Sequence, residues 1–297
     1  QLLVFTGGVS TGKRVAAACG ERLIPCVMEL GGKAPFIACA DVDIERTARG
    51  IVYGGFTNAG QVCIAVERVY AHREIHDRLL SRVVELTKEL KIGDPSTDYV
   101  DIGAIIFPQQ MDIAEKHIQD AVAKGARLET GGKRRPGPGQ FFEPTVLSGC
   151  DHSMSVMTGE IFGPVVPFMS VASDEEAIAL ANESHLGLNA YVFSGDRGHG
   201  KRVAERVEAG SVLVNDVVIN GGMPEAPFGG IKQSGFGRVM SDESLREMCD
   251  VRHVNEERMA MPGDPFWFPY TEKSYNVFKK GMRVLFGGGS LADRIKG

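Results

Sequence analysis

The sequence has few of the features by which several protein classes are recognised. Its six cysteines include no CxxC pair, and no histidine stands at metal-ligand spacing from them. This pattern argues against a disulfide framework and against a structural zinc site, so no metal is expected. No apolar run reaches the length that a bilayer-spanning helix needs. These absences favour a protein of a reducing, cytoplasmic compartment.

The excess of one sign of charge over the other is also small. The 33 Lys and Arg residues nearly balance the 38 Asp and Glu residues, which leaves a net charge of -5 without basic clusters. A nucleic-acid partner requires a basic patch or stripe, so none is expected. With 43% hydrophobic residues among 297, the chain fits an ordinary globular protein of one large or two medium domains. It begins at Gln1, without methionine and directly in an apolar strand pattern, which favours a part of a longer protein.

Short apolar segments alternate with amphipathic ones along the chain. This alternation predicts an α/β fold with a largely parallel sheet. The segments expected as strands are 2–5, 27–30, 35–38, 68–72, 127–130 at an edge, 164–171, 190–193 and 211–215. The segments expected as helices are 14–21, 44–56, 74–90, 109–124, 174–182 and 201–207.

Two residues suggest covalent chemistry. Cys63 stands in a Gly- and Asn-bearing turn, and Glu29 stands 34 positions earlier, before a glycine doublet. A thiol becomes a useful nucleophile when its site favours the thiolate, and a carboxylate can act as a base when burial raises its pKa toward neutrality. A lone cysteine is more often a small core residue. Taken together, the pair predicts a nucleophile of low pKa and a general base.

A glycine-bearing turn follows the first expected strand. Thr6, Gly7 and Gly8 lie between this strand and the first helix, a layout that presents backbone N–H groups to a phosphate. The spacing is neither GxGxxG nor a Walker A loop, since Arg14 follows Lys13 where Ser or Thr would be needed. By itself the turn is a weak signal, because many such turns are only tight connections.

Five motifs carry a resemblance to a known family. In order along the chain they are Phe5-Thr6-Gly7, Glu29-Leu30-Gly31-Gly32-Lys33, Asn58-Ala59-Gly60-Gln61-Val62-Cys63, Glu160-Ile161-Phe162-Gly163-Pro164-Val165 and Pro227-Phe228-Gly229-Gly230-Ile231-Lys232-Gln233-Ser234-Gly235-Phe236-Gly237-Arg238. The set resembles the aldehyde dehydrogenase superfamily, from about Val4 to Met240.

The resemblance implies oxidation of an aldehyde to a carboxylic acid, with hydride transfer to NAD or NADP. Cys63 would attack the aldehyde carbon, and its own backbone N–H would help to stabilise the oxyanion. Loss of hydride would leave a thioester on Cys63, and Glu29 would activate the water that hydrolyses it. A CoA-acylating relative and a non-catalytic homologue with a role in assembly are the alternatives. Glu29 argues against the first, because transfer to CoA does not need that base.

The resemblance also implies which residues contact the cofactor. Leu30 and Gly31 would lie beside the nicotinamide, Glu160 would bond the ribose hydroxyls, and Phe162 would pack close by. Thr6, Gly7 and Gly8 would lie near the pyrophosphate, although Gly8 stands where many members have a serine. Two residues are proposed for the substrate: Asn215 lines its path or caps a turn, and Phe228 borders the aldehyde tunnel or belongs to the core.

The resemblance further implies a three-layer αβα architecture in which the N-terminal half of the dinucleotide-binding domain precedes Gln1. The expected parts are 1–31, a remnant of that domain; 32–231, the catalytic domain; and 232–297, a C-terminal return and oligomerisation segment. Alone, this chain is expected to bind the cofactor poorly and to turn over little aldehyde. A homodimer or homotetramer is implied, with a strand for the neighbouring subunit within 249–255.

The C-terminal tail carries an amphipathic pattern. Tyr275, Phe278, Met282 and Leu285 recur at helical spacing among basic residues. Such a helix, over about 270–286, either docks on its own protein or lies on an anionic membrane surface. Docking is the favoured interpretation, since the apolar stripe is short and has no lipid anchor.

Overall fold

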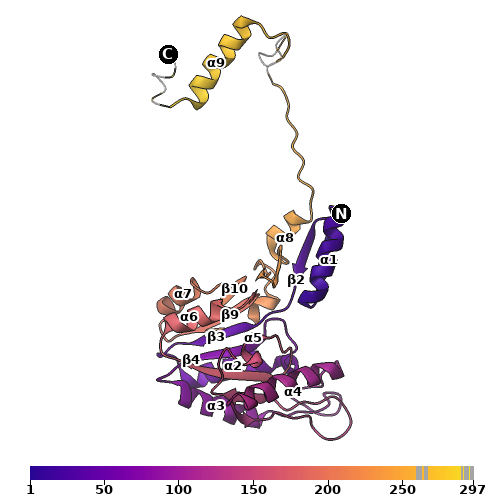
Figure 1. Cartoon of the computed structure of the whole chain (residues 1–297), viewed down its shortest axis with the longest axis vertical. Helices are drawn as coiled ribbons and strands as arrows, with labels where there is room; N and C mark the ends of the chain where they lie inside the picture. Colours follow the sequence, from indigo (N-terminus) through magenta and orange to yellow (C-terminus); the bar gives the residue numbers. More distant parts are fainter. Residues whose placement is uncertain (259–262, 264–266, 289, 291–293, 295–297) are drawn as a thin grey trace. The chain divides into compact units, whose positions relative to one another are not determined.

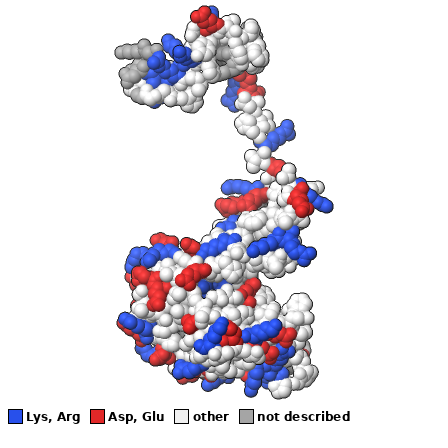
Figure 2. Space-filling model, in the orientation of Figure 1, with Lys and Arg blue, Asp and Glu red and all other residues white. Residues whose placement is uncertain are grey.

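A computed structural model describes residues 1–258, 263, 267–288, 290 and 294. Their contacts form two compact units, Gln1–Cys249 and Asp250–Gly297. On the face drawn in Figure 2, acidic and basic side chains are interspersed over the first unit, so this face has no extended surface of one sign.

The core of the first unit is a seven-stranded sheet in the order β10-β9-β3-β4-β7-β6-β5. Adjacent strands are parallel, except β5, which pairs antiparallel with β6 at the edge. Strands buried on both faces need continuous apolar sequence, and every residue of β3 and β9 is buried. The strands are β3 (Ala34–Ala38), β4 (Val66–His72), β5 (Arg127–Thr130), β6 (Thr145–Ser148), β7 (Val165–Val171), β9 (Asn189–Phe193) and β10 (Ser211–Val214).

Helices cover both faces of this sheet. From β3 the chain passes through α2 to β4 on one side, whereas from β7 it passes through α6 to β9 on the other side of β3. Right-handed crossovers in opposite directions place their helices on opposite faces. Figure 1 accordingly shows α2 and α3 on the side of the sheet opposite α6 and α7. The helices are α2 (Ile44–Phe56), α3 (His76–Glu89), α4 (Pro108–Ala123), α5 (Ser155–Thr158), α6 (Asp174–Asn182) and α7 (Arg197–Ala204).

A smaller sheet contains the N-terminal strands. β1 (Leu3–Thr6) and β2 (Cys26–Glu29) are parallel and connected by α1 (Val9–Glu21), while β12 (Gly235–Phe236) pairs antiparallel with β2. Two short strands, β8 (Leu186–Gly187) and β11 (Ile231–Lys232), form a separate antiparallel pair. The chain therefore returns to its N-terminal strands before α8 (Ser241–Glu247).

The α/β class and the largely parallel sheet are confirmed. Two helices begin earlier than predicted: α1 begins at Val9, and α7 begins at Arg197, where the Asp196 side chain accepts a hydrogen bond from the Gly198 N–H. Glycines near these starts hide them from the sequence pattern. β6 was not predicted, because its four residues follow a Pro- and Gly-rich loop.

In the second unit the predicted amphipathic helix forms as α9 (Glu272–Phe286), with a capping box between Thr271 and Ser274. Its docking or membrane contact stays a prediction. Within the described part of the chain, no helix is long and apolar enough to cross a membrane. Residues 249–255 form no strand within the single chain, so the intersubunit strand stays a prediction. The division at 31 and 231 is likewise a proposal.

Candidate active site

A cavity of about 650 Å³ lies where the carboxyl ends of β1 and β2 meet the loop that carries Cys63. It brings together every residue expected for catalysis and for the cofactor. Its lining also includes residues that were not singled out for a role, two of them on α4. The lining consists of Thr6, Gly7, Gly8, Glu29, Leu30, Gly31, Gln61, Val62, Cys63, Gln110, Ile113, Glu160 and Phe162.

The turn before Cys63 has an unusual backbone. Asn58, Ala59 and Gly60 have φ angles of 50°, 56° and 71°, in the left-handed region that non-glycine residues rarely adopt. The Asn58 and Gln61 side-chain amides each donate to the other residue's carbonyl, at 3.1 and 3.0 Å. This reciprocal pair stabilises the strained turn, and strain of this kind concentrates at functional sites.

Gly32 allows this loop to approach closely. A Cβ added at Gly32 would lie 2.3 Å from the carbonyl oxygen of Cys63. Only glycine fits this backbone-to-backbone contact. The glycine doublet therefore determines how near Cys63 lies to the end of β2.

Glu29 ends β2 and is almost completely buried. Its Oε1 atom has no hydrogen-bond partner among the described residues. Burial raises the pKa of Glu29 to about 7, against an opposing effect of the Arg238 charge. The carboxyl group can therefore gain and lose a proton near neutral pH, as a general base requires.

The thiol of Cys63 departs from the expectation. Burial raises its pKa above the ordinary value, and the Glu29 carboxylate raises it further. The expectation of a low-pKa thiol is wrong for this state of the site. The reason is that a nearby anion and a desolvated setting both disfavour a second negative charge.

Glu160 lies against the glycine doublet. Its Oε1 accepts a hydrogen bond of 3.0 Å from the Gly32 N–H, and a Cβ added at Gly31 would lie 2.3 Å from its Oε2. Burial, followed by the charge of Glu67, raises the pKa of Glu160 to about 7. A second titratable carboxyl group thus lines the same cavity as Glu29.

A buried ion pair that sequence reasoning missed supports this loop. Lys33 Nζ lies 2.8 Å from Glu67 Oε2, and both side chains are almost fully buried. The Glu67 carboxylate also accepts hydrogen bonds from the backbone N–H groups of Ile161 and Phe162, and Phe162 has a positive φ of 52°. The available signal was two adjacent charged residues, Glu67 and Arg68, within strand β4, where burial without partners would be costly.

The two substrate candidates lie outside this lining. Asn215 follows β10. Its side-chain amide accepts a hydrogen bond from the Ser194 N–H and donates one to the Ser194 carbonyl, at 2.9 Å each. Phe228 is buried in a small apolar cluster with Ile64 and Leu188, against which Cys63 packs. Phe228 is therefore near the thiol, whereas the Asn215 amide is occupied in a backbone contact. Their roles toward a substrate stay predictions.

The turn after β1 leads into the start of a helix. Gly8 is the N-cap of α1 and supplies no side-chain cap, and the first turn contains no acidic residue. The N–H groups at the start of a helix have no partner within the helix, and they carry a partial positive charge. Because Thr6, Gly7 and Gly8 line the cavity, this helix start can receive a negatively charged group.

These features define an α/β protein with a thiol and a carboxyl group in one cavity at the ends of parallel strands. The chain belongs to the aldehyde dehydrogenase family, whose model matches residues 1–254. It is 38% identical to 4,4'-diapolycopene aldehyde oxidase of a Methylomonas species, over 99% of the chain and 54% of that protein. It is 38% identical to betaine aldehyde dehydrogenase of Bacillus subtilis, over 90% of the chain and 55% of that protein.

Solved structures of related enzymes support the same family. A betaine aldehyde dehydrogenase from Staphylococcus aureus in complex with NAD+ superposes with a TM-score of 0.78 at 37% identity, covering 83% of this chain and 49% of that one. An NADP-dependent enzyme from E. coli superposes with a TM-score of 0.80 at 36% identity, covering 83% and 51%. The chain thus spans about half the length of the relatives it matches.

Proposed function

We propose that the protein to which this chain belongs oxidises an aldehyde to a carboxylic acid with NAD or NADP. The observation that carries the proposal is that Cys63 and Glu29 line one cavity, with the Glu29 carboxyl group buried and titrating near pH 7. Relatives named for aldehyde oxidation support this activity.

In the first half of the reaction, the Cys63 thiol gives up its proton and its sulfur bonds to the aldehyde carbon. The product is a thiohemiacetal, and the backbone N–H of Cys63 stabilises its developing oxyanion. Loss of hydride from this carbon turns the thiohemiacetal into a thioester. Glu29, which lies close enough to raise the pKa of the thiol, can accept the thiol proton, and it passes this proton to solvent before it acts on water.

In the second half, Glu29 takes a proton from water, whose oxygen attacks the thioester carbon. The carbon–sulfur bond breaks, the carboxylic acid leaves, and the proton returns to the Cys63 sulfur. Dividing the oxidation from the hydrolysis gives two easier steps in place of one. The raised pKa of Glu29 makes its carboxylate a stronger base than an exposed one.

The residues present fit a dinucleotide. The uncapped start of α1 and the turn at Thr6, Gly7 and Gly8 would hold phosphate, and Glu160 would accept hydrogen bonds from ribose hydroxyls. Leu30 would line the place of the nicotinamide. When bound, NAD or NADP supplies the acceptor for the hydride.

An activated ester tests the Cys63–Glu29 pair without cofactor, because its acyl group reaches the thiol directly. With p-nitrophenyl acetate, we expect slow turnover by the chain, no turnover in Cys63→Ala, and a stoichiometric burst in Glu29→Gln followed by a stable acetyl adduct on Cys63. All variants carry Cys249→Ser, which removes an exposed thiol. The control is Glu225→Gln, which removes an exposed carboxyl group. Turnover by Glu29→Gln at the unmodified rate would refute the assigned base.

The acyl acceptor is tested with the full-length protein. A free carboxylic acid as product, with CoA present or absent, supports water as the acceptor. An acyl-CoA product would instead support the CoA-acylating alternative.

We further propose an apolar aldehyde as substrate. The similarity to the diapolycopene aldehyde oxidase extends over 99% of the chain, and the cavity lining contains no Lys or Arg that could pair with a carboxylate of the substrate. Comparison of kcat/KM for a long-chain aldehyde and for succinate semialdehyde tests this choice. A higher value for the semialdehyde would contradict it.

A further inference from the structure

We propose that Cys39, Asp174 and His199 form a binding site for a divalent transition metal ion, with Zn²⁺ as the best match. The site lies in a cavity of about 450 Å³ that shares no lining residue with the cavity of Cys63. Its three residues are far apart in sequence, so ligand spacing along the chain gave no sign of it. This proposal departs from the sequence-based expectation of no metal.

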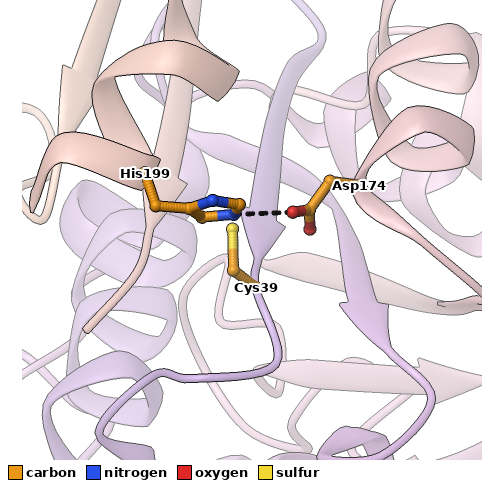
Figure 3. A group of neighbouring side chains, drawn as sticks. All are labelled: Cys39, Asp174 and His199. Atoms are coloured by element: carbon orange, nitrogen blue, oxygen red, sulfur yellow. Dashed lines mark hydrogen bonds and ion pairs between the residues drawn. The ribbon is translucent and has the colours of Figure 1, made fainter. Parts of the chain in front are cut away.

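The three side chains converge on one point. Their ligand atoms all lie within 4.8 Å of one another, and the His199 Nε2 atom lies 2.7 Å from Asp174 Oδ2. Figure 3 shows the Cys39 sulfur pointing toward the same side of the imidazole ring as the carboxylate. In a thiol–imidazole–carboxylate relay, the thiol and the acid contact opposite ring nitrogens. Convergence on one side is the arrangement of metal ligands.

The position in the fold is one where ligands bind in open α/β sheets. Cys39 follows β3, Asp174 begins α6 after β7, and His199 lies in α7 after β9. The strand order reverses at β3. The next strand along the chain, β4, pairs with one edge of β3, and the crossover that leaves β7 leads to β9 at its other edge. Such a switch point leaves a crevice beyond the carboxyl ends of the strands.

The charge of the cavity suits a cation. The lining contains carboxylates and imidazoles but no Lys or Arg, and it consists of Cys39, Ala40, Asp41, His72, Ser173, Asp174, Glu175, Asp196 and His199. Asp41 and Asp196 are held by hydrogen bonds from Ser194 Oγ and the Gly198 N–H, so they contribute negative charge without being ligands. An anion would be repelled from this lining.

The ligand types select the metal. Thiolate and imidazole bind Zn²⁺ well, and one carboxylate completes a three-residue set with a fourth tetrahedral position for water. On binding, Zn²⁺ replaces the proton of the Cys39 thiol and separates His199 from Asp174. Burial and the Asp174 charge raise the pKa of this thiol in the free chain, so the bound cation has to compensate for both.

Zn²⁺ alone, titrated into the whole 297-residue chain against a colorimetric chelator, tests the site. We expect one tight site per chain and a thiolate-to-metal absorption band when Co²⁺ replaces Zn²⁺. His199→Gln and Asp174→Asn should each weaken Zn²⁺ binding by about 100-fold. Both residues are only partly buried, so these variants should keep the circular dichroism of the parent. Cys39→Ser should remove the Co²⁺ band.

Cys63→Ser and Cys249→Ser are the matched controls, because they remove a partly buried and an exposed thiol outside the cluster. They should bind Zn²⁺ like the parent. Absence of a stoichiometric site would overturn the proposal, as would variants of His199 and Asp174 that bind unchanged. Loss of the site in Cys63→Ser would overturn it as well, since the metal would then lie in the other cavity.

Discussion

Cys63 and Glu29 influence each other because both are largely removed from water. The thiol pKa is raised by burial and by the Glu29 carboxylate, while the carboxyl group has a pKa of about 7. Glu29 therefore repels the thiolate only above about pH 7, where it is ionised. This coupling holds the nucleophile protonated until its proton is taken in the reaction.

Replacement of the carboxylate should make the thiol more reactive. In Glu29→Gln the pKa of Cys63 falls, so alkylation by iodoacetamide at pH 8 should be faster by about threefold or more, since one pKa unit changes the thiolate fraction about tenfold. At pH 6 Glu29 is protonated in the parent, and the two rates should agree. Mass spectrometry of the Cys63 peptide measures both. Equal or slower alkylation of the variant at pH 8 would contradict the coupling, and Glu225→Gln serves as the control.

The two glycines of the doublet should differ in tolerance. In Gly32→Ala the new methyl group meets the Cys63 backbone at 2.3 Å, which can be relieved only by movement of the loop. In Gly31→Ala it meets the end of the Glu160 side chain, which can rotate away. We expect Gly32→Ala to lose about 3 kcal/mol or more and Gly31→Ala distinctly less, measured by denaturant unfolding. Equal losses would show that the contact at Gly32 is not limiting.

At the scale of elements, strand β4 positions the loop of Glu160 through one side chain. Its buried Glu67 carboxylate accepts hydrogen bonds from the backbone N–H groups of Ile161 and Phe162 and forms an ion pair with Lys33. Buried charges of this kind are costly to leave unpaired. The ion pair therefore links β3, β4 and the cavity wall.

Removal of one partner should be more harmful than removal of both. We expect Glu67→Gln to cost about 3–5 kcal/mol, because Lys33 remains buried without its counterion. The double variant Lys33→Met with Glu67→Gln should recover part of this loss. Urea unfolding of the single and double variants makes the comparison. A single variant as stable as the parent would refute a structural role for the pair.

Helix α9 should not bind membranes. Its apolar residues include Phe278 and Leu285, which form only a short apolar stripe among several basic residues. In flotation with anionic vesicles, we expect the whole chain and a chain lacking residues 265–297 both to stay in solution. Flotation of the whole chain alone would reverse this interpretation.

At the scale of the whole molecule, an oligomer is predicted. Val251 and Val254 are exposed in a segment that forms no strand within the chain. β-branched residues of this kind suit an added strand that pairs with a second subunit. We expect a dimer or tetramer in light scattering, and a shift toward monomer in Val251→Lys with Val254→Lys. Glu256→Lys, just beyond the expected strand at 249–255, should leave the oligomer intact, and a monomeric parent would contradict the prediction.

Much of the fold could be predicted from the sequence because its signals are local. The α2 boundaries follow from the 3.6-residue apolar period and the Asp43 cap, and β3 and β9 follow from continuous apolar runs. The sequence did not predict the start of α7, which contains glycines, or the four-residue strand β6. Tertiary contacts rather than local propensity define both.

The sequence by itself determined the family and predicted the thiol and the carboxyl group of the site, because these depend on residue types in a fixed order. Only the tertiary structure decided that Cys63 has a raised pKa, that Glu67 supports the Glu160 loop, and that Cys39, Asp174 and His199 meet. The physical reason is that burial, charge proximity and ligand convergence depend on distances through space. When residues far apart in the sequence meet in the fold, the local sequence around each of them does not show that they are close in space.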